Sequence, residues 1–159
     1  MRALIQVAHL CFAATVTAEG RPNLSPKGTI RVWNDTSVFF LDIASPGTRA
    51  NLAARPWMEL NVVDQLSRRG YRFAGPAVLH TQGTVFDDAC RRVLGEDQAT
   101  YPVAAVVLLE IASAAPLISP GYLHTPDENA MRSLWRGRRA ALDQQLDAFI
   151  ATQPPFPRA

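Results

Sequence analysis

The feature that most constrains the fold of this chain is a series of short strand-forming runs, each followed closely by turn residues. Segments such as Glu19-Gly20 and Ser45-Pro46-Gly47 interrupt the runs, and helical spacing is confined to three places. Antiparallel pairing of so many strands in a sheet that closes into a barrel leaves few strand edges exposed. We therefore predict an α+β fold, an antiparallel six-stranded β-barrel with a few flanking helices. Its strands fall at residues 10–16, 24–33, 37–43, 57–63, 71–80 and 103–111.

The helical patterns follow the third and fifth strands and end the chain. Thr48 is the expected cap of a short helix that ends by Arg55, because Pro56 follows. A second helix is expected from Thr84 to Gly95, and a third from about Glu128 to Ala151.

Length and composition indicate one globular domain. The chain has 159 residues, of which 48% are hydrophobic and 19% charged. We expect a single domain over residues 1–151 and a proline-rich C-terminal tail over residues 152–159. Polar residues interrupt the apolar start of the chain, and no run approaches the ~20 apolar residues of a membrane span. We expect a cytoplasmic protein without a membrane partner.

The charged and metal-binding residue types are scattered. The net charge is +2, and Lys27 is the one lysine among 16 basic residues. The basic residues form no stripe, so we expect no nucleic-acid partner. Cys11 and Cys90 belong to no paired motif, and the three histidines lie in unrelated segments. We therefore expect neither a disulfide framework nor a metal site. The sequence also lacks the dinucleotide-binding, P-loop and nucleophile-elbow motifs.

A polar strand face is the first candidate binding feature. Side chains alternate along a strand, so Ser25, Lys27 and Thr29 share one face. Pro26 cannot donate to a central ladder, and Gly28 lets another group approach the backbone. These residues predict a ligand-facing edge strand. The alternative is an ordinary polar face turned to solvent.

A strand-to-helix corner is the second candidate feature. Ser45, Thr48 and Arg49 lie where the third strand ends and a helix begins. The free N–H groups of a helix start, together with hydroxyl and guanidinium donors, suit a phosphate. The alternative is a capped turn with a solvated arginine.

The residues of both features carry a family resemblance. The run from Ala14 to Thr29 and the run from Phe39 to Leu52 resemble the pyridoxamine 5'-phosphate oxidase-like, FMN-binding split-barrel family. Residues 61–64 and 68–75 continue the resemblance in the same order, and together it spans about residues 10–111. The resemblance implies a split barrel that binds FMN as a homodimer.

The resemblance also implies the roles of individual residues. It places the second strand and two residues of its neighbour at the flavin ring: Ser25, Pro26, Lys27, Gly28, Thr29, Phe40 and Leu41. It assigns the phosphate to the helix corner, with Ser45, Thr48, Arg49 and Asn51 as ligands. The partner protomer is expected to contribute Arg69, Gly70 and Tyr71.

The chain departs from the true oxidases at two places. They carry adjacent Ser-Arg-Lys at the phosphate corner, where this chain has Ser45-Pro46-Gly47. Their C-terminal strand that grips pyridoxal phosphate is not recognisable here. We therefore expect a flavoprotein oxidoreductase of unknown substrate and electron donor, not a vitamin B6 oxidase. The alternatives are a flavin-binding module without turnover, a deazaflavin- or haem-binding relative, and a cofactor-free dimeric barrel.

Overall fold

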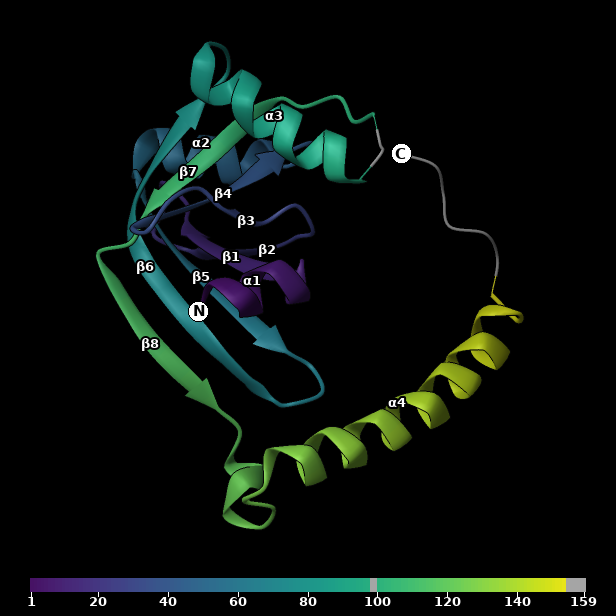
Figure 1. Cartoon of the computed structure of the whole chain (residues 1–159). Helices are drawn as coiled ribbons and strands as arrows, with labels where there is room; N and C mark the ends of the chain where they lie inside the picture. The colour runs from purple at the N-terminus through teal and green to yellow at the C-terminus, as the bar shows by residue number, and fades with distance from the viewer. Residues whose placement is uncertain (98–99, 154–159) are drawn as a thin grey trace. The chain divides into compact units, whose positions relative to one another are not determined.

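A computed structural model describes residues 1–97 and 100–153 of the chain (Figure 1). The chain divides into two compact units. The strand unit comprises Met1–Asp64 and Arg69–Leu117, and the helical unit comprises Gln65–Arg68 and the chain from Ile118 on. The expected single domain over residues 1–151 stays a prediction. Residues 154–159 of the expected proline-rich tail lie outside the described residues.

The strand unit is a curled antiparallel sheet, which confirms the α+β split-barrel class. Its strands hydrogen-bond in the order β2-β1-β5-β6-β7-β4-β3, and β8 pairs with β6 off this path. The bounds are β1 Cys11–Val16, β2 Pro22–Lys27, β3 Arg31–Val32, β4 Ser37–Asp42, β5 Trp57–Asp64, β6 Arg69–His80, β7 Ala105–Glu110 and β8 Ser113–Ile118. Three helices accompany them in this unit: α1 Arg2–Ala8, α2 Pro46–Ala54 and α3 Thr84–Asp97.

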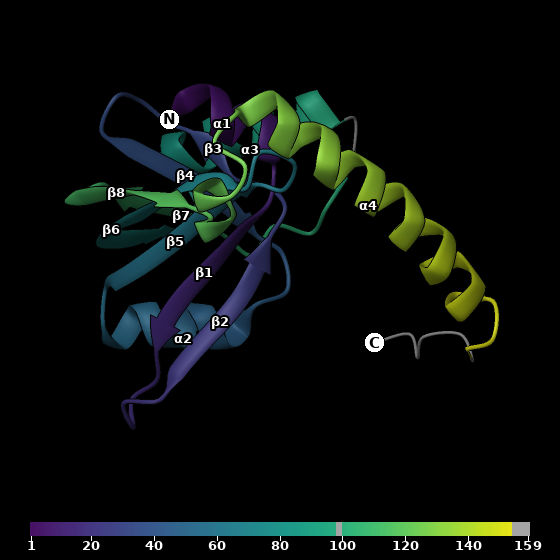
Figure 2. The ribbon, with the colours of Figure 1, turned by 90° about the horizontal axis from the view of Figure 1, so that it is seen from below.

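The expected strand over residues 24–33 is two strands in the structure. β2 lies at the sheet edge beside β1, as Figure 2 shows, whereas β3 pairs with β4. Pro26 therefore sits on an edge strand, where its missing N–H costs no ladder bond. The turn before β2 holds Gly20 at φ 83°, a left-handed conformation that glycine adopts without strain. The chain thus changes sheet partner just after Lys27, within the predicted ligand-facing run.

Two elements of the structure carry no clear sequence signal. α1 has seven residues and buries only Ile5. β8 reads Ser-Ala-Ala-Pro-Leu-Ile and is almost wholly exposed. Small residues and a proline have low strand propensity, so neighbouring β6 determines this strand more than its own sequence does.

β6 joins the two halves of the sheet. Residues 69–76 pair with β5, and residues 77–80 pair with β7 (Figure 1). Gly75 lies two residues before the first residue paired with β7, and a Cβ there would come within 1.9 Å of the Glu110 carbonyl oxygen. Only glycine allows this approach of two backbones. β6 therefore passes from one half of the sheet to the other without a break.

Two groups of buried side chains form the core of the strand unit. The larger lies inside the curled sheet and includes Phe40, Leu60 and Phe73. The smaller packs α3 against β4 and β7 through residues such as Phe39 and Val93. Among the helices of residues 1–97 and 100–153, none has the length and apolar character needed to span a membrane.

The helical unit contains a 3-10 turn, Pro120–Leu123, and the helix α4, Glu128–Ile150. The Asp127 carboxylate caps α4 by accepting from the Ala130 N–H at 2.8 Å. The expected C-terminal helix is therefore confirmed. In the N-terminal segment of this unit, the Ser67 carbonyl accepts from the Tyr122 hydroxyl at 2.6 Å. The Arg68 guanidinium lies over the Trp135 ring at 4.1 Å.

Candidate cofactor site

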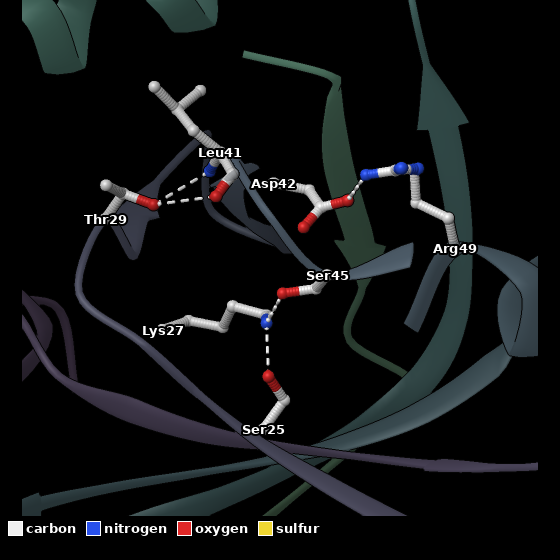
Figure 3. A network of polar contacts seen from close by, with 7 residues as sticks. All are labelled: Ser25, Lys27, Thr29, Leu41, Asp42, Ser45 and Arg49. Carbon is white, nitrogen blue, oxygen red and sulfur yellow. Dashed lines mark hydrogen bonds and ion pairs between the residues drawn. The ribbon is translucent and has the colours of Figure 1, made fainter. Parts of the chain in front are cut away.

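Lys27 is the centre of the candidate site. It is the last residue of β2 and is only 5% exposed. Its Nζ donates to Ser25 Oγ at 2.5 Å and to Ser45 Oγ at 2.6 Å (Figure 3). Ser45 occupies the N-cap position of α2, where its side chain makes no capping hydrogen bond. The lysine therefore joins the two features that the sequence indicates separately, the polar strand face and the helix corner.

The positive charge of Lys27 is held by neutral oxygens. Among the described residues, both hydrogen-bond partners of its ammonium are hydroxyls, and the centre of the Phe40 ring lies 5.7 Å from Nζ. Burial lowers the pKa of Lys27, and the negative charge of Asp42 opposes this shift in part. Hydroxyl dipoles orient a cation without neutralising it. The site thus retains net positive charge that an anionic ligand group can use.

A cavity of about 180 Å³ opens beside Lys27 and is walled by the loop after β2 and by the end of β4. Small-molecule pockets usually measure about 300–1,000 Å³. A group as large as a flavin therefore needs a further wall from outside this cavity. The lining residues are Pro26, Lys27, Gly28, Thr29, Leu41, Ile43, Ala44 and Ser45, six of which are among the predicted flavin and phosphate ligands.

Arg49 has an ionic partner of its own. Its Nη1 lies 2.5 Å from Asp42 Oδ2, and the Asp42 side chain is fully buried (Figure 3). The other carboxylate oxygen, Asp42 Oδ1, makes no hydrogen bond within the described residues. The Asp42 carboxylate balances the charge of the Arg49 guanidinium. Arg49 should therefore attract a phosphate less strongly than Lys27 does. Its role as a phosphate ligand stays a prediction.

Several other predicted ligands are engaged within the fold. The Thr29 hydroxyl accepts from the Leu41 N–H at 2.9 Å and lies 3.1 Å from the Leu41 carbonyl. Asn51 Nδ2 donates to Thr15 Oγ1 at 2.9 Å, which ties α2 to β1. Thr48 is 2% exposed, and the Phe40 side chain is in the main core. These side chains position the loop and the helix around Lys27.

The structure does not bring Arg69, Gly70 and Tyr71 to the Lys27 cavity within one chain. Lys27 pairs with Cys11, Cys11 with Val62, and Val62 with Tyr71. Strands lie about 4.8 Å apart, so this row places the Tyr71 backbone about 14 Å from that of Lys27. These residues are not in the described lining of the Lys27 cavity, and we predicted that they contact its ligand from a second copy of the chain. That contact stays a prediction.

The sequence analysis missed Asp42, the buried partner of Arg49. The signal was present, because this carboxylate closes the run Val38-Phe39-Phe40-Leu41 immediately before the helix corner. Charged residues are rarely fully buried unless they are paired. An acid at the end of an apolar strand, with Arg49 seven residues later, is the pattern to look for.

The donors of the site suit the anionic part of FMN. The buried Lys27 ammonium and its partner Ser45 line the cavity, and α2 begins at its edge with Pro46 at the first turn. A helix start favours negative charge, and proline is well tolerated there. Lys27 is the residue best placed to take the role that we expected of Arg49.

Comparison with known proteins gives a family match and structural neighbours. The family model described as pyridoxamine 5'-phosphate oxidase matches residues 1–114. The crystal structure of HupZ from Group A Streptococcus is 30% identical and superposes with a TM-score of 0.68, covering 75% of this chain and 92% of that one. A search of curated proteins gave no match.

Two more distant structures share the fold. An FMN-binding protein from Syntrophomonas wolfei is 18% identical with a TM-score of 0.61, and the match covers 72% of this chain and 82% of that one. HutZ, the haem storage protein of Vibrio cholerae, is 17% identical with a TM-score of 0.53, and the match covers 73% of this chain and 89% of that one.

Proposed function

The chain belongs to the pyridoxamine 5'-phosphate oxidase-like, FMN-binding split-barrel family, and on that premise we propose that it binds FMN and acts as an oxidoreductase. The observation that carries the proposal is the buried Lys27 ammonium, held by Ser25 and Ser45 at the wall of a cavity. When bound, a flavin supplies the electron or hydride transfer, while the protein supplies binding, orientation and electrostatics.

The residues of this chain have distinct roles in the proposed site. Lys27 binds the anionic part of the cofactor and favours negative charge near its Nζ. The serine hydroxyls hold the ammonium in place, and Thr29 fixes the loop to β4 through Leu41. A ligand can approach the backbone of Gly28 closely because glycine has no Cβ. The nearest described group to the position of a Cβ there is the His9 carbonyl oxygen, at 3.9 Å. We assign no general acid or base among the described residues that line the cavity.

We propose that the working form is a homodimer in which the partner supplies the missing wall. The cavity of one chain is smaller than a flavin requires, and residues 69–71 lie three strands from Lys27 in the same chain. A second copy can place its residues 69–71 over the first copy's cavity. The proposed cellular location is the cytoplasm.

Flavin is favoured over haem by the chemistry of the lining. Haem iron in proteins is held by histidine, cysteine, methionine or tyrosine. Within one chain, the described lining of the cavity beside Lys27 has none of these and holds an ammonium instead, and residues 69–71 of the proposed partner wall add one residue of these types, Tyr71. The likeness to HutZ at 17% identity is a likeness of fold. FMN therefore remains our choice, with a deazaflavin as the alternative that shares its anionic character.

The test is an absorbance spectrum of the purified protein, followed by FMN titration of the wild type, Lys27→Met and Arg21→Gln. Arg21 is a matched control, because it is an exposed cation in the turn before β2. We expect flavin bands on a dimer, an affinity loss of about tenfold or more for Lys27→Met, and a change within about twofold for Arg21→Gln.

Three results would contradict the proposal. They are no uptake of FMN by the wild type, equal affinities of wild type and Lys27→Met, or a haem spectrum. Reduction of the bound FMN by a nicotinamide cofactor, measured by loss of the flavin band, separates an oxidoreductase from a module that only holds flavin.

A further inference from the structure

A second cavity lies within the helical unit, between the segment Gln65–Arg68 and the helix α4. It measures about 270 Å³, and its described lining residues come from these two elements alone. It shares no lining residue with the cavity beside Lys27. We call it the Trp135 cavity, after the aromatic residue in its lining. Ligand binding in the two cavities can therefore be tested separately, and binding in the Trp135 cavity does not require FMN.

The backbone of the segment Gln65–Arg68 is fixed to the rest of the helical unit. The Ser67 carbonyl accepts from the Tyr122 hydroxyl at 2.6 Å, and the Arg68 carbonyl accepts from the Ser119 N–H at 3.1 Å. Arg68 has φ 57°, a left-handed conformation that is uncommon for residues other than glycine. Such a conformation persists only where the surrounding structure holds it. The wall that carries the Arg68 side chain is therefore a fixed part of the unit.

The Arg68 guanidinium is held in place while its hydrogen-bond donors stay available. It lies over the Trp135 ring, 4.1 Å from the ring centroid. Stacking of this kind uses the flat face of a guanidinium, whereas the N–H donors lie at its edge. Among the described residues, the Arg68 side chain makes neither a hydrogen bond nor an ion pair. This cation is therefore positioned to accept an anionic group from a ligand.

The second cation in the lining, Arg139, has partners within the unit. Its Nη1 donates to Gln65 Oε1 at 2.8 Å, and its Nε lies 3.8 Å from Asp143 Oδ2. Two arginines and one aspartate give the described lining a formal charge of +1. A single negative charge on a ligand therefore balances the lining.

The remaining walls of the Trp135 cavity are largely apolar. Leu66 and Leu142 line it together with Trp135. Because Arg68 and Arg138 both lie over the Trp135 ring, the two leucines are the surfaces left for an apolar ligand body. An apolar cavity of about 150 Å³ can bind benzene, so a volume of about 270 Å³ has room for a ring and a charged group.

We propose that the Trp135 cavity binds a small monocarboxylate with an aromatic body. The carboxylate pairs with the edge of the Arg68 guanidinium, which can donate two parallel N–H bonds to it. The ring packs against Leu66 and Leu142, where burial of its apolar surface stabilises the complex. A phosphate group carries about 1.5–2 negative charges at pH 7, which is more than this lining balances.

The experiment is a titration of the full chain with benzoate at constant ionic strength, followed by saturation-transfer NMR. Benzamide is the uncharged probe of similar shape, and inorganic phosphate is the competitor that lacks an apolar body. The fluorescence change of the wild type, compared with that of a Trp135→Phe variant, shows whether benzoate binds beside this tryptophan.

Two pairs of variants separate the cation and the apolar wall from the general properties of the surface. Arg68→Gln is compared with Arg136→Gln, because Arg136 is an exposed arginine of α4 outside the described lining. Leu142→Ala is compared with Leu134→Ala, because both leucines are partly exposed on α4 and only Leu142 lines the cavity. Lys27→Met tests the other cavity.

We expect saturable benzoate binding to the wild type, with benzamide at least about tenfold weaker and no displacement of benzoate by an equal concentration of phosphate. Arg68→Gln should weaken benzoate binding about tenfold or more, and Leu142→Ala about threefold or more. Arg136→Gln, Leu134→Ala and Lys27→Met should stay within about twofold. Circular dichroism and thermal unfolding check that each variant remains folded.

Five outcomes would overturn the proposal. The first is the absence of saturable benzoate binding, and the second is equal affinity for benzamide, which removes the role of the charge. The third is displacement of benzoate by phosphate. The fourth is an equal loss in Arg68→Gln and Arg136→Gln, which indicates general attraction to a basic surface. The fifth is loss of binding in Lys27→Met with retention in Arg68→Gln, which places benzoate in the other cavity.

Discussion

Two cations lie on either side of the junction between β4 and α2, and the fold treats them differently. Arg49 is paired with the fully buried carboxylate of Asp42, whereas Lys27 donates hydrogen bonds to the hydroxyls of Ser25 and Ser45 (Figure 3). A carboxylate partner cancels charge, and a hydroxyl partner only orients it. The comparison suggests that Arg49 holds the junction together and that Lys27 keeps its charge for a ligand.

The largest expected effect is a loss of stability on removal of the Arg49 guanidinium. Arg49→Ala leaves the buried Asp42 carboxylate without its ionic partner, so we expect the free energy of unfolding to fall by about 3 kcal/mol. Urea unfolding at neutral pH measures it. Arg91→Ala removes a comparable but exposed pair with Asp88 and should cost about 0.5 kcal/mol or less. Similar losses in the two variants would show that the Asp42 pair is no more than a surface contact.

The next effect concerns the loop that follows Lys27 and contains Thr29. Thr29→Val removes the hydroxyl that bonds the backbone of Leu41, leaving buried polar groups without that partner. We expect a loss of about 1–3 kcal/mol in the free energy of unfolding, with FMN affinity of the folded protein little changed. Thr36→Val, at an exposed hydroxyl, is the control. A loss of FMN affinity without a loss of stability would make Thr29 a direct ligand instead.

The smallest effect is a pH dependence of stability that arises from the Lys27 ammonium. Burial lowers the pKa of Lys27 in the folded chain, so the unfolded chain holds this proton more tightly. Stability then rises with pH through the interval between the folded and unfolded pKa values, on the alkaline side of neutrality. The difference in unfolding free energy between wild type and Lys27→Met should increase from pH 7 to about 10. A flat or falling difference would mean that the ammonium is not desolvated in the fold.

Much of the fold was predictable because alternation and helical spacing are local signals. The strands β1, β4, β5, β6 and β7 and the helices α2, α3 and α4 lie where these patterns place them. The predicted strand over residues 24–33 is two strands because residues 22–27 pair with β1, whereas residues 31–32 pair with β4. The chain bends at Gly28 between them. The N-cap of α2 is Ser45, three residues before the expected Thr48, because proline at the first helical position fits the helix start.

The site was only partly predictable because it depends on contacts between side chains of elements that are distant in sequence. The sequence indicates a polar face at Lys27 and an anion corner at Ser45 but cannot show that one side chain joins them. It also cannot show that Arg49 turns toward Asp42, since that depends on how α2 leaves β4. The expected contributions of Arg69, Gly70 and Tyr71 concern a second chain and stay predictions.

The strand β6 has a consequence for how the strand unit comes apart. Its first part, which includes Gly75, is paired with β5, and its last part, from Ala77 on, is paired with β7. Fraying of β6 therefore releases partners in both halves of the sheet at once. The barrel should lose its amide protection against solvent exchange as one cooperative event, and the short outer strands β3 and β8 alone should open earlier.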